Sequence, residues 1–194
     1  MTDKELGIHA EEVQIDGTDS FHCHRYEPTS YEVLEELFYH YTPMENDVIV
    51  DYGCGLGRLN FYVENRFSLM STGVELADRY YTGALKNRET YLGDKEKITF
   101  VQCAAQNYEV APNETVFYFF NPFSISIFRQ VINRILLSWQ EHPRVLTLIL
   151  YYPEDDVVFY IEQHTSFALF GEFASGEEVK CDRRERFCLY RLDI

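Results

Sequence analysis

One stretch, Val48–Arg58, constrains what the chain can fold into more than any other part of it. It begins with a β-branched apolar run, which is typical of a buried parallel strand. Glycines then stand at alternate positions, Gly53, Gly55 and Gly57. Because glycine tolerates positive φ and has no Cβ, this turn can bend sharply and let a ligand lie against bare backbone. A helix that begins at Arg58 would point its first amide groups back at the loop, so the stretch predicts a nucleotide-binding corner.

The spacing of the glycines distinguishes between kinds of nucleotide site. A dinucleotide fingerprint requires G-x-G-x-x-G and a P-loop requires a Lys followed by Ser or Thr, whereas this loop reads G-x-G-x-G. Such a site also needs an acid at the end of the next strand, where it accepts from ribose hydroxyls. Glu75 lies 18 positions after Gly57, close to the roughly 20 that this role requires. The loop and the acid together indicate a nucleotide site more strongly than a glycine turn alone.

The pattern Asp51-x-Gly53-x-Gly55-x-Gly57, followed by Glu75, resembles the first motifs of the class I S-adenosylmethionine (SAM) dependent methyltransferases. The resemblance covers roughly residues 29–194. It implies that the loop backbone approaches the methionine and ribose parts of SAM, that Asp51 orients the loop or the methionine amino group, and that Glu75 accepts from the ribose. The residues that it assigns to the cofactor are Asp51, Tyr52, Gly53, Cys54, Gly55, Gly57, Glu75, Leu76, Ala104, Ala105 and Asn121.

The rest of the chain alternates between strand and helix patterns. A capping box at residues 29–32 predicts a helix from Ser30 to about Tyr41. Helical spacing also predicts a helix over 77–92 with Gly93 as its left-handed cap, and another over 125–139 with Ser124 as its N-cap. The predicted strands are 48–50, 69–76, 98–103, 115–120, 144–151, 166–170 and 187–192. This order predicts a three-layer, doubly wound α/β domain with a mostly parallel seven-stranded sheet and a C-terminal antiparallel hairpin, the fold that the resemblance implies.

We divide the chain into an N-terminal arm, 1–28, and a SAM-binding domain, 29–194. Residues 1 to about 19 are polar without a clear period, which indicates a flexible or loosely docked arm. The resemblance suggests that residues 26–29 form a lid on the cofactor pocket. The run His22-Cys23-His24 invites a metal site, but no second cluster at ligand spacing accompanies it. Two polar side chains near the rim of a site are the better interpretation, so we predict no metal.

Charge and cysteine content narrow the function further. Acidic residues outnumber basic ones by 32 to 17, for a formal net charge of −15. This balance disfavours DNA or long RNA as a partner without excluding a local basic patch. The five cysteines form no C-x-x-C pair, which is typical of free thiols in a reducing cytoplasm. No apolar stretch approaches the roughly 18 residues of a membrane span, and no signal-peptide core follows the polar N-terminus, so we expect a cytoplasmic protein.

The segment after the third predicted strand departs from the family pattern. An acid or amide there often contacts the adenine amino group, but this chain reads Cys103-Ala104-Ala105-Gln106, with alanine where aspartate is common. Gln106 or a backbone carbonyl could take that contact instead.

The tripeptide Asn121-Pro122-Phe123 resembles the (Asp/Asn/Ser)-Pro-Pro-(Tyr/Phe) motif of amino-group methyltransferases, and it is one proline short. Asn121 can still accept from an amine and Phe123 can still stack on a base. The alternative is a strand-to-helix turn in which Phe123 serves as packing. Both interpretations stay open, and Phe123 and Tyr152 are candidate substrate contacts, whereas Phe117 and Phe119 are expected in the core.

Together these features predict a SAM-dependent methyltransferase. The methyl group of SAM is already activated, so the protein chiefly positions the acceptor atom, and Asn121 is the candidate residue for that role. A small molecule or a protein side chain suits the acidic surface, whereas an RNA base suits the tripeptide at Asn121. A SAM-binding module without catalysis is supported only by the missing acid at Ala104 and Ala105. A nicotinamide-dependent oxidoreductase is disfavoured by the glycine spacing.

Overall fold

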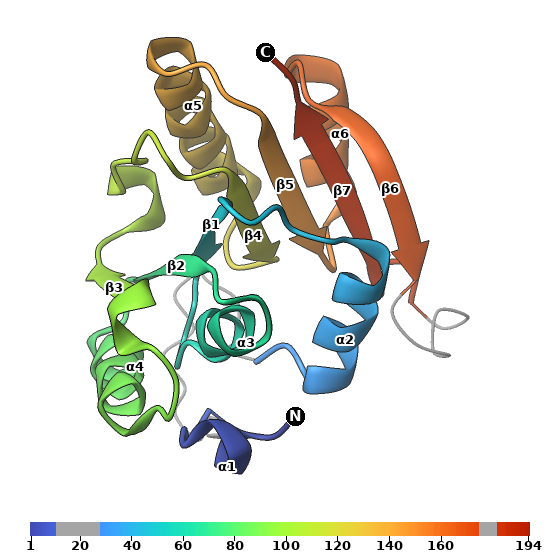
Figure 1. Cartoon of the computed structure of the whole chain (residues 1–194). Coiled ribbons are helices and arrows are strands. Elements are labelled where there is room, and N and C mark those ends of the chain that lie inside the picture. The colour runs from blue at the N-terminus through green and yellow to red at the C-terminus, as the bar shows by residue number, and fades with distance from the viewer. Residues whose placement is uncertain (11–27, 175–181) are drawn as a thin grey trace.

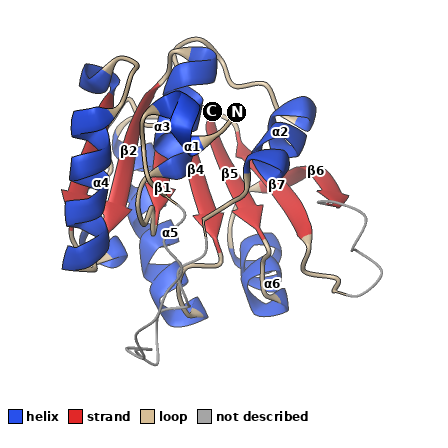
Figure 2. Cartoon of the chain, turned by 90° about the horizontal axis from the view of Figure 1, so that it is seen from below, coloured by secondary structure: helices blue, strands red, loops and turns tan. Residues whose placement is uncertain are grey.

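The computed structural model describes residues 1–10, 28–174 and 182–194. A seven-stranded sheet runs through the molecule with helices on both faces (Figures 1 and 2). The strands are β1 (Val48–Tyr52), β2 (Met70–Glu75), β3 (Ile98–Gln102), β4 (Val116–Phe120), β5 (Leu146–Tyr151), β6 (Ala168–Ala174) and β7 (Arg186–Leu192). The helices are α1 (Asp3–Leu6), α2 (Tyr31–His40), α3 (Arg58–Phe67), α4 (Asp78–Thr90), α5 (Ile125–Glu141) and α6 (Asp155–His164), with 3-10 turns η1 (Lys95–Lys97) and η2 (Ala105–Asn107).

The order of the strands confirms the predicted fold class. The sheet runs β3-β2-β1-β4-β5-β7-β6. The strands from β3 to β5 are parallel to one another, whereas β7 is antiparallel to both β5 and β6. From β1 the chain first builds outward on one side through β2 and β3, and then on the other through β4 and β5. The switch point of this doubly wound sheet therefore lies between the carboxyl ends of β1 and β4, where such folds bind ligands.

Two apolar cores lie on the two faces of the sheet. Helices α1, α2, α3 and α4 cover one face, and α5 and α6 cover the other (Figure 2). Because successive side chains of a strand point to opposite faces, Tyr118 of β4 joins the first core and its neighbours Phe117 and Phe119 join the second. Phe117 and Phe119 are 0% and 2% exposed, which confirms that they are core residues.

The cap predicted at Gly93 is wrong. Helix α4 ends at Thr90, and the glycines with positive φ in the described residues are Gly7, Gly53, Gly55 and Gly57. A Cβ at Gly93 would lie 2.4 Å from the Glu64 carboxylate and within 2.6 Å of the Tyr91 ring. Close packing against the end of α3, not a left-handed backbone, therefore explains this glycine.

The beginning of the N-terminal arm is docked into the core, contrary to the prediction of a loose arm. Leu6, Ile8 and Ala10 are 1%, 1% and 0% exposed and belong to the same core as α3 and α4. Figure 1 shows α1 beneath the two helices. The first two residues of the proposed lid, 26 and 27, and the run His22-Cys23-His24 lie outside the described residues. Within the described ranges, no helix is long and apolar enough to cross a membrane, and no group of three potential metal ligands occurs.

Candidate functional site

The glycine loop that follows β1 adopts the backbone that its sequence predicts. Gly53, Gly55 and Gly57 have φ angles of 79°, 55° and 86°, in the left-handed region that disfavours other residues. A Cβ at Gly53 would lie 2.8 Å from Cβ of Pro122, and one at Gly57 would lie 2.6 Å from the Phe100 ring. Both the backbone angles and the surrounding side chains therefore require glycine in this loop.

Hydrogen bonds hold the loop against the end of β2. The amides of Gly53 and Cys54 both donate to the carbonyl of Val74, at 2.8 and 3.2 Å, and the Gly57 amide donates to the Cys54 carbonyl at 2.9 Å. Helix α3 begins directly after Gly57, and no side chain caps its N-terminus. Its first amides thus face the loop, as a corner that binds a polar ligand requires.

Glu75, at the carboxyl end of β2, lies beside the glycine loop. Its carboxylate accepts from the Gly55 amide at 3.0 Å through Oε2 and from the Ala77 amide at 2.7 Å through Oε1. Burial raises the pKa of Glu75, and these two amides partly offset the rise. Glu75 therefore links the end of β2 to the loop, and each oxygen keeps acceptor capacity for a further donor.

Asp51 lies one strand away and is almost fully buried, at 5% exposure. In the sheet it pairs with Gly73 of β2 and Tyr118 of β4. Burial, together with the nearby negative charge of Glu75, raises the pKa of Asp51 to about 8. Two acids whose charged forms are disfavoured thus lie at one edge of the sheet, and a cationic group bound beside them would relieve the cost of their ionisation.

A ledge of small and apolar side chains borders the crevice on the β3 side. The Cys103 amide donates to the Glu75 carbonyl at 3.1 Å, so the segment after β3 follows directly beside the acid. Ala104 and Ala105 are partly exposed at the start of η2, and Leu76 is 56% exposed. These side chains can cover the face of a flat apolar group, and they offer no charged partner to its edge.

The carboxyl ends of β4 and β5 carry two residues in a backbone conformation that is rare outside glycine. Asn121 and Tyr152 have φ angles of 36° and 54°, and they follow the paired residues Phe120 and Tyr151. A polar network surrounds them. The Asn121 amide and Arg184 both donate to Glu154 Oε1, at 3.5 and 2.8 Å. Arg184 also lies 4.6 Å from the centre of the Tyr152 ring, and the Tyr152 hydroxyl donates to Asp182.

The side chains of two predicted site residues lie in the core. Tyr52 is 1% exposed and stacks on Phe119 with ring centres 5.0 Å apart. Phe123 is 7% exposed and packs edge-on against the same ring at 6.2 Å. The Tyr52 ring therefore faces the core and only its backbone adjoins the loop, so the cofactor contact predicted for Tyr52 stays a prediction that concerns this backbone. For Phe123 the structure matches the packing alternative, because the turn after β4 directs its ring under α5.

Several residues at the site were not predicted from the sequence. Arg58, the first residue of α3, is 7% exposed and donates to the Thr29 carbonyl at 3.4 Å. The Thr29 hydroxyl is hydrogen-bonded to the buried Tyr118 hydroxyl at 2.8 Å. Glu154 and Arg184 complete the network at Asn121. The capping box predicted at Thr29 does not form, because Ser30 caps α2 and accepts from the Val33 amide at 3.3 Å. The contacts of Thr29 and Arg58 join residues far apart in the chain, so no local pattern indicated them.

Neither a protein-family model nor a curated protein sequence matches this chain. Solved structures do match it. An RNA methyltransferase from Salinibacter ruber, in complex with S-adenosyl-L-homocysteine, aligns over 85% of this chain and 92% of its own with a TM-score of 0.58 and 16% identity. The glycopeptide N-methyltransferase MtfA, complexed with SAM, aligns over 87% and 89% with a TM-score of 0.62 and 12% identity.

A third match is Sp1610 from Streptococcus pneumoniae, a putative tRNA (m1A22) methyltransferase in complex with SAM. It aligns over 84% of this chain and 72% of its own, with a TM-score of 0.60 and 18% identity. The chain therefore has the class I SAM-dependent methyltransferase fold.

Proposed function

We propose that the chain is a SAM-dependent methyltransferase. The observation that carries the proposal is the pair of acids, buried Asp51 and partly buried Glu75, beside a glycine loop at the switch point of the sheet. Solved proteins of this fold hold SAM or S-adenosyl-L-homocysteine. The neighbours share at most 18% identity with the chain, so the case for function rests on the site itself.

The residues present fit SAM. A Cβ at Gly53 or Gly57 would lie within 2.8 Å of Pro122 or Phe100, so only glycine fits at these positions. The loop therefore presents its backbone, and no side chain of these two residues, to a ligand. We assign the cationic methionine amino group to Asp51, because a cation favours the ionised form of a buried carboxyl group. We assign the ribose hydroxyls to Glu75, whose oxygens keep lone pairs beyond their two backbone bonds. Leu76, Ala104 and Ala105 form the ledge for adenine.

When bound, SAM supplies a methyl group that its sulfonium has already activated. The task left to the chain is to hold the acceptor atom in line, at about 3–3.5 Å, and to exclude water. Asn121 suits this role because its Nδ2 donates to Glu154, at 3.5 Å, which leaves Oδ1 to accept a hydrogen from the acceptor. The rigid turn after β4 fixes the direction of that oxygen.

We favour a small molecule or a protein side chain as the acceptor. A formal net charge of −15 opposes a polyanionic substrate. The buried ring of Phe123 also offers no open face for a nucleobase. An RNA base remains the alternative, and the solved structures described above include an RNA methyltransferase and a putative tRNA methyltransferase. A non-catalytic SAM-binding module is a second alternative, supported by Ala104 and Ala105 in place of an adenine-binding acid.

Methyl transfer from labelled SAM to separate RNA, protein and small-molecule fractions tests the proposal. We expect label in the protein or small-molecule fraction. Asn121→Gly removes the amide while keeping the positive φ, so it should bind S-adenosyl-L-homocysteine normally and lose transfer by about 10- to 100-fold. Asn121→Asp, which keeps an oxygen acceptor, should retain more activity than Asn121→Gly.

The other results identify the alternatives. Label found only in RNA would favour the RNA base. Tight binding of S-adenosyl-L-homocysteine with no transfer to any fraction would favour the non-catalytic module. Equal activity of Asn121→Gly and the unmodified protein would contradict the role of Asn121.

A further inference from the structure

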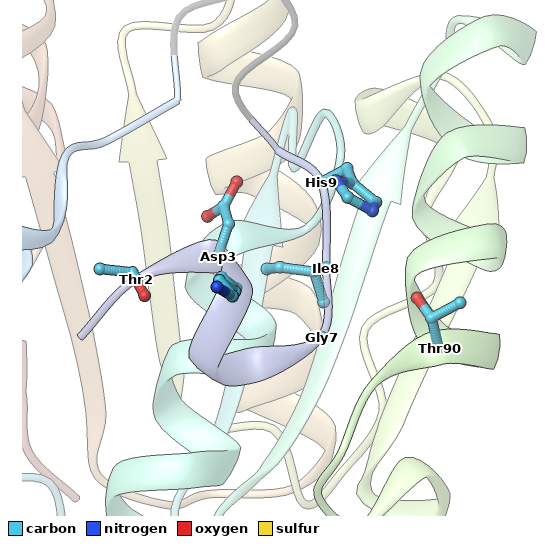
Figure 3. Close-up of a pocket in the computed structure, with 7 residues that line it drawn as sticks. Thr2, Asp3, Gly7, Ile8, His9 and Thr90 are labelled. Carbon is cyan, nitrogen blue, oxygen red and sulfur yellow. The ribbon is translucent and has the colours of Figure 1, made fainter.

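The first ten residues of the chain lie against the back of the glycine loop. After α1 the chain passes Gly7, Ile8 and His9 alongside α4, which carries Thr90 (Figure 3). An open pocket of about 880 Å³ is lined by residues of this segment and by Thr90 of α4. None of the glycine-loop residues lines it. The Leu92 amide donates to the Leu6 carbonyl at 3.0 Å, so backbone pairing fixes the segment to the end of α4.

The first link from this segment to the loop is an ion pair between Asp3 and Arg58. The carboxylate of Asp3 accepts from Nε of Arg58 at 3.2 Å and from Nη2 at 3.3 Å. Asp3 also accepts from the Ala10 amide and from the Tyr31 hydroxyl. Arg58 directly follows Gly57 and is 7% exposed. A buried ion pair tolerates little change, because removal of one partner leaves the other charge uncompensated.

The second link runs through Asn87 of α4. Its Oδ1 accepts from the His9 amide at 2.9 Å, and its Nδ2 donates to the His9 carbonyl at 3.2 Å and to the Leu56 carbonyl at 3.0 Å. Leu56 stands between the second and third glycines of the loop. Asn87 is 4% exposed, so one buried amide joins the backbone of the N-terminal segment to the backbone of the loop.

The loop is thus held from two sides. Glu75 binds the Gly55 amide from within the crevice, at 3.0 Å, and Asn87 binds the Leu56 carbonyl from behind. The Leu56 side chain is also tightly packed, since a Cβ at Gly83 of α4 would lie 2.3 Å from it. Arg58 of α3 and Asn87 of α4, which adjoin or bind the glycine loop, are thus also hydrogen-bonded to residues 1–10.

We infer that residues 1–10 are a functional part of the cofactor site, and that Asp3, Arg58 and Asn87 are positioning residues that set the affinity of the glycine loop for its ligand. The inference rests on the proposed function for the identity of that ligand. No residue of the segment needs to touch the cofactor, because a loop that is held in its binding conformation loses less conformational freedom on binding. By reciprocity, a bound ligand should also hold the segment more firmly.

Calorimetric titration with S-adenosyl-L-homocysteine tests the inference on the full chain. Asp3→Asn and Asn87→Ala should each weaken binding by about 5- to 100-fold, in the usual range of coupling between sites. The matched control is Glu5→Gln, which makes the same change of charge on the same segment at a carboxylate that is 67% exposed. It should bind within about twofold of the unmodified protein. Unchanged binding by both Asp3→Asn and Asn87→Ala would overturn the inference.

Hydrogen exchange of the ligand-free protein gives a readout that does not depend on the identity of the cofactor. Asp3→Asn should speed exchange of the Gly55 and Gly57 amides at least fivefold and leave the amides of β5 and β7 unchanged. Equal acceleration in the loop and in these strands would show global destabilisation and overturn the inference, as would no change in the loop. If the unmodified protein failed to bind S-adenosyl-L-homocysteine, the proposed function would fail, and exchange would still decide whether the segment positions the loop.

Discussion

At the scale of single residues, Asp51 combines a buried position with a titratable group. Its pKa is raised to about 8 by burial and by the nearby Glu75 carboxylate. The unfolded chain ionises the same group near pH 4. Between these values the folded protein binds more protons than the unfolded chain, so the free energy of unfolding should fall as pH rises through this window. Below about pH 4 the contribution of protonated Asp51 to the free energy of unfolding is fully present, and this contribution is lost by about pH 8.

Asp51→Asn tests this linkage. The substitution keeps the shape of the side chain and removes its titration, so unfolding free energies from urea should depend less on pH between 5 and 8. The difference between the two proteins should be on the order of 1 kcal/mol per pH unit. Glu114 also has a raised pKa and contributes to both proteins alike, whereas Glu75, which repels Asp51, should ionise more readily in Asp51→Asn and so add to the difference. Parallel pH profiles for the two proteins would contradict the raised pKa of Asp51.

The sequence was sufficient to predict the backbone of the glycine loop after β1 but not which side chains face it. The three loop glycines adopt the expected backbone, and Glu75 meets the loop as expected. Tyr52 lies next to that loop in sequence, yet its ring enters the core because alternate strand residues point to opposite faces. Which face is which depends on the helices that cover the sheet, and a motif does not contain that information.

At the scale of elements, packing between the loop and neighbouring strands explains a glycine that no motif requires. A Cβ at Gly73 in β2 would lie 2.6 Å from the Phe100 ring and 2.7 Å from Sγ of Cys54. Cys54 belongs to the glycine loop, so a methyl group at Gly73 would press on the loop from the sheet side.

Gly73→Ala should therefore destabilise the protein by about 1–3 kcal/mol, the usual cost of overpacking a core. Thermal or urea unfolding measures the loss. The double variant with Phe100→Leu, which shortens the offending side chain, should lose less than the sum of its single variants, because the two positions are in contact. A Gly73→Ala protein as stable as the original, or strictly additive losses, would contradict the packing described here.

The N-terminal segment shows the limit of local prediction for whole elements. Helix α1 is four residues long, and a polar run without a period gave no sign of it. Arg58, the partner of Asp3, lies 55 residues from it in the chain. Asn87, the partner of His9, lies 78 residues from it. Contacts over such separations come from the tertiary fold, so the contacts between the arm, Arg58 and Asn87 could be recognised only in the structure.

At the scale of the whole molecule, the alternation of strands and helices predicted the architecture. The seven strands were expected near their observed positions, and β6 and β7 form the predicted C-terminal antiparallel hairpin, in which β7 is also antiparallel to β5. The largest shift is in β6, expected at 166–170 and observed at Ala168–Ala174. The register of this edge strand is irregular between Leu169 and Gly171. Because such a bulge breaks the two-residue period of a strand, the end of β6 could not be predicted from that period.

The topology also explains why the site is built from so many separate segments. Parallel strands meet with their carboxyl ends at one edge, so the loops after β1, β2, β3, β4 and β5 converge there. Asp51 and Glu75 lie at the ends of β1 and β2, and the network around Asn121 follows β4 and β5. The division into a cofactor half and an acceptor half that we propose would follow from this strand order.

The most direct test of the account is calorimetric titration of the purified protein with S-adenosyl-L-homocysteine, repeated on Glu75→Ala. The matched control is Glu96→Ala, which removes a glutamate that is 91% exposed in η1. We predict binding in the micromolar range, about −8 kcal/mol, for the unmodified protein and the control, and a loss of at least tenfold for Glu75→Ala in a protein that remains folded. No binding by the folded, unmodified protein, or equal binding by Glu75→Ala, would contradict the assignment of the glycine corner to this cofactor.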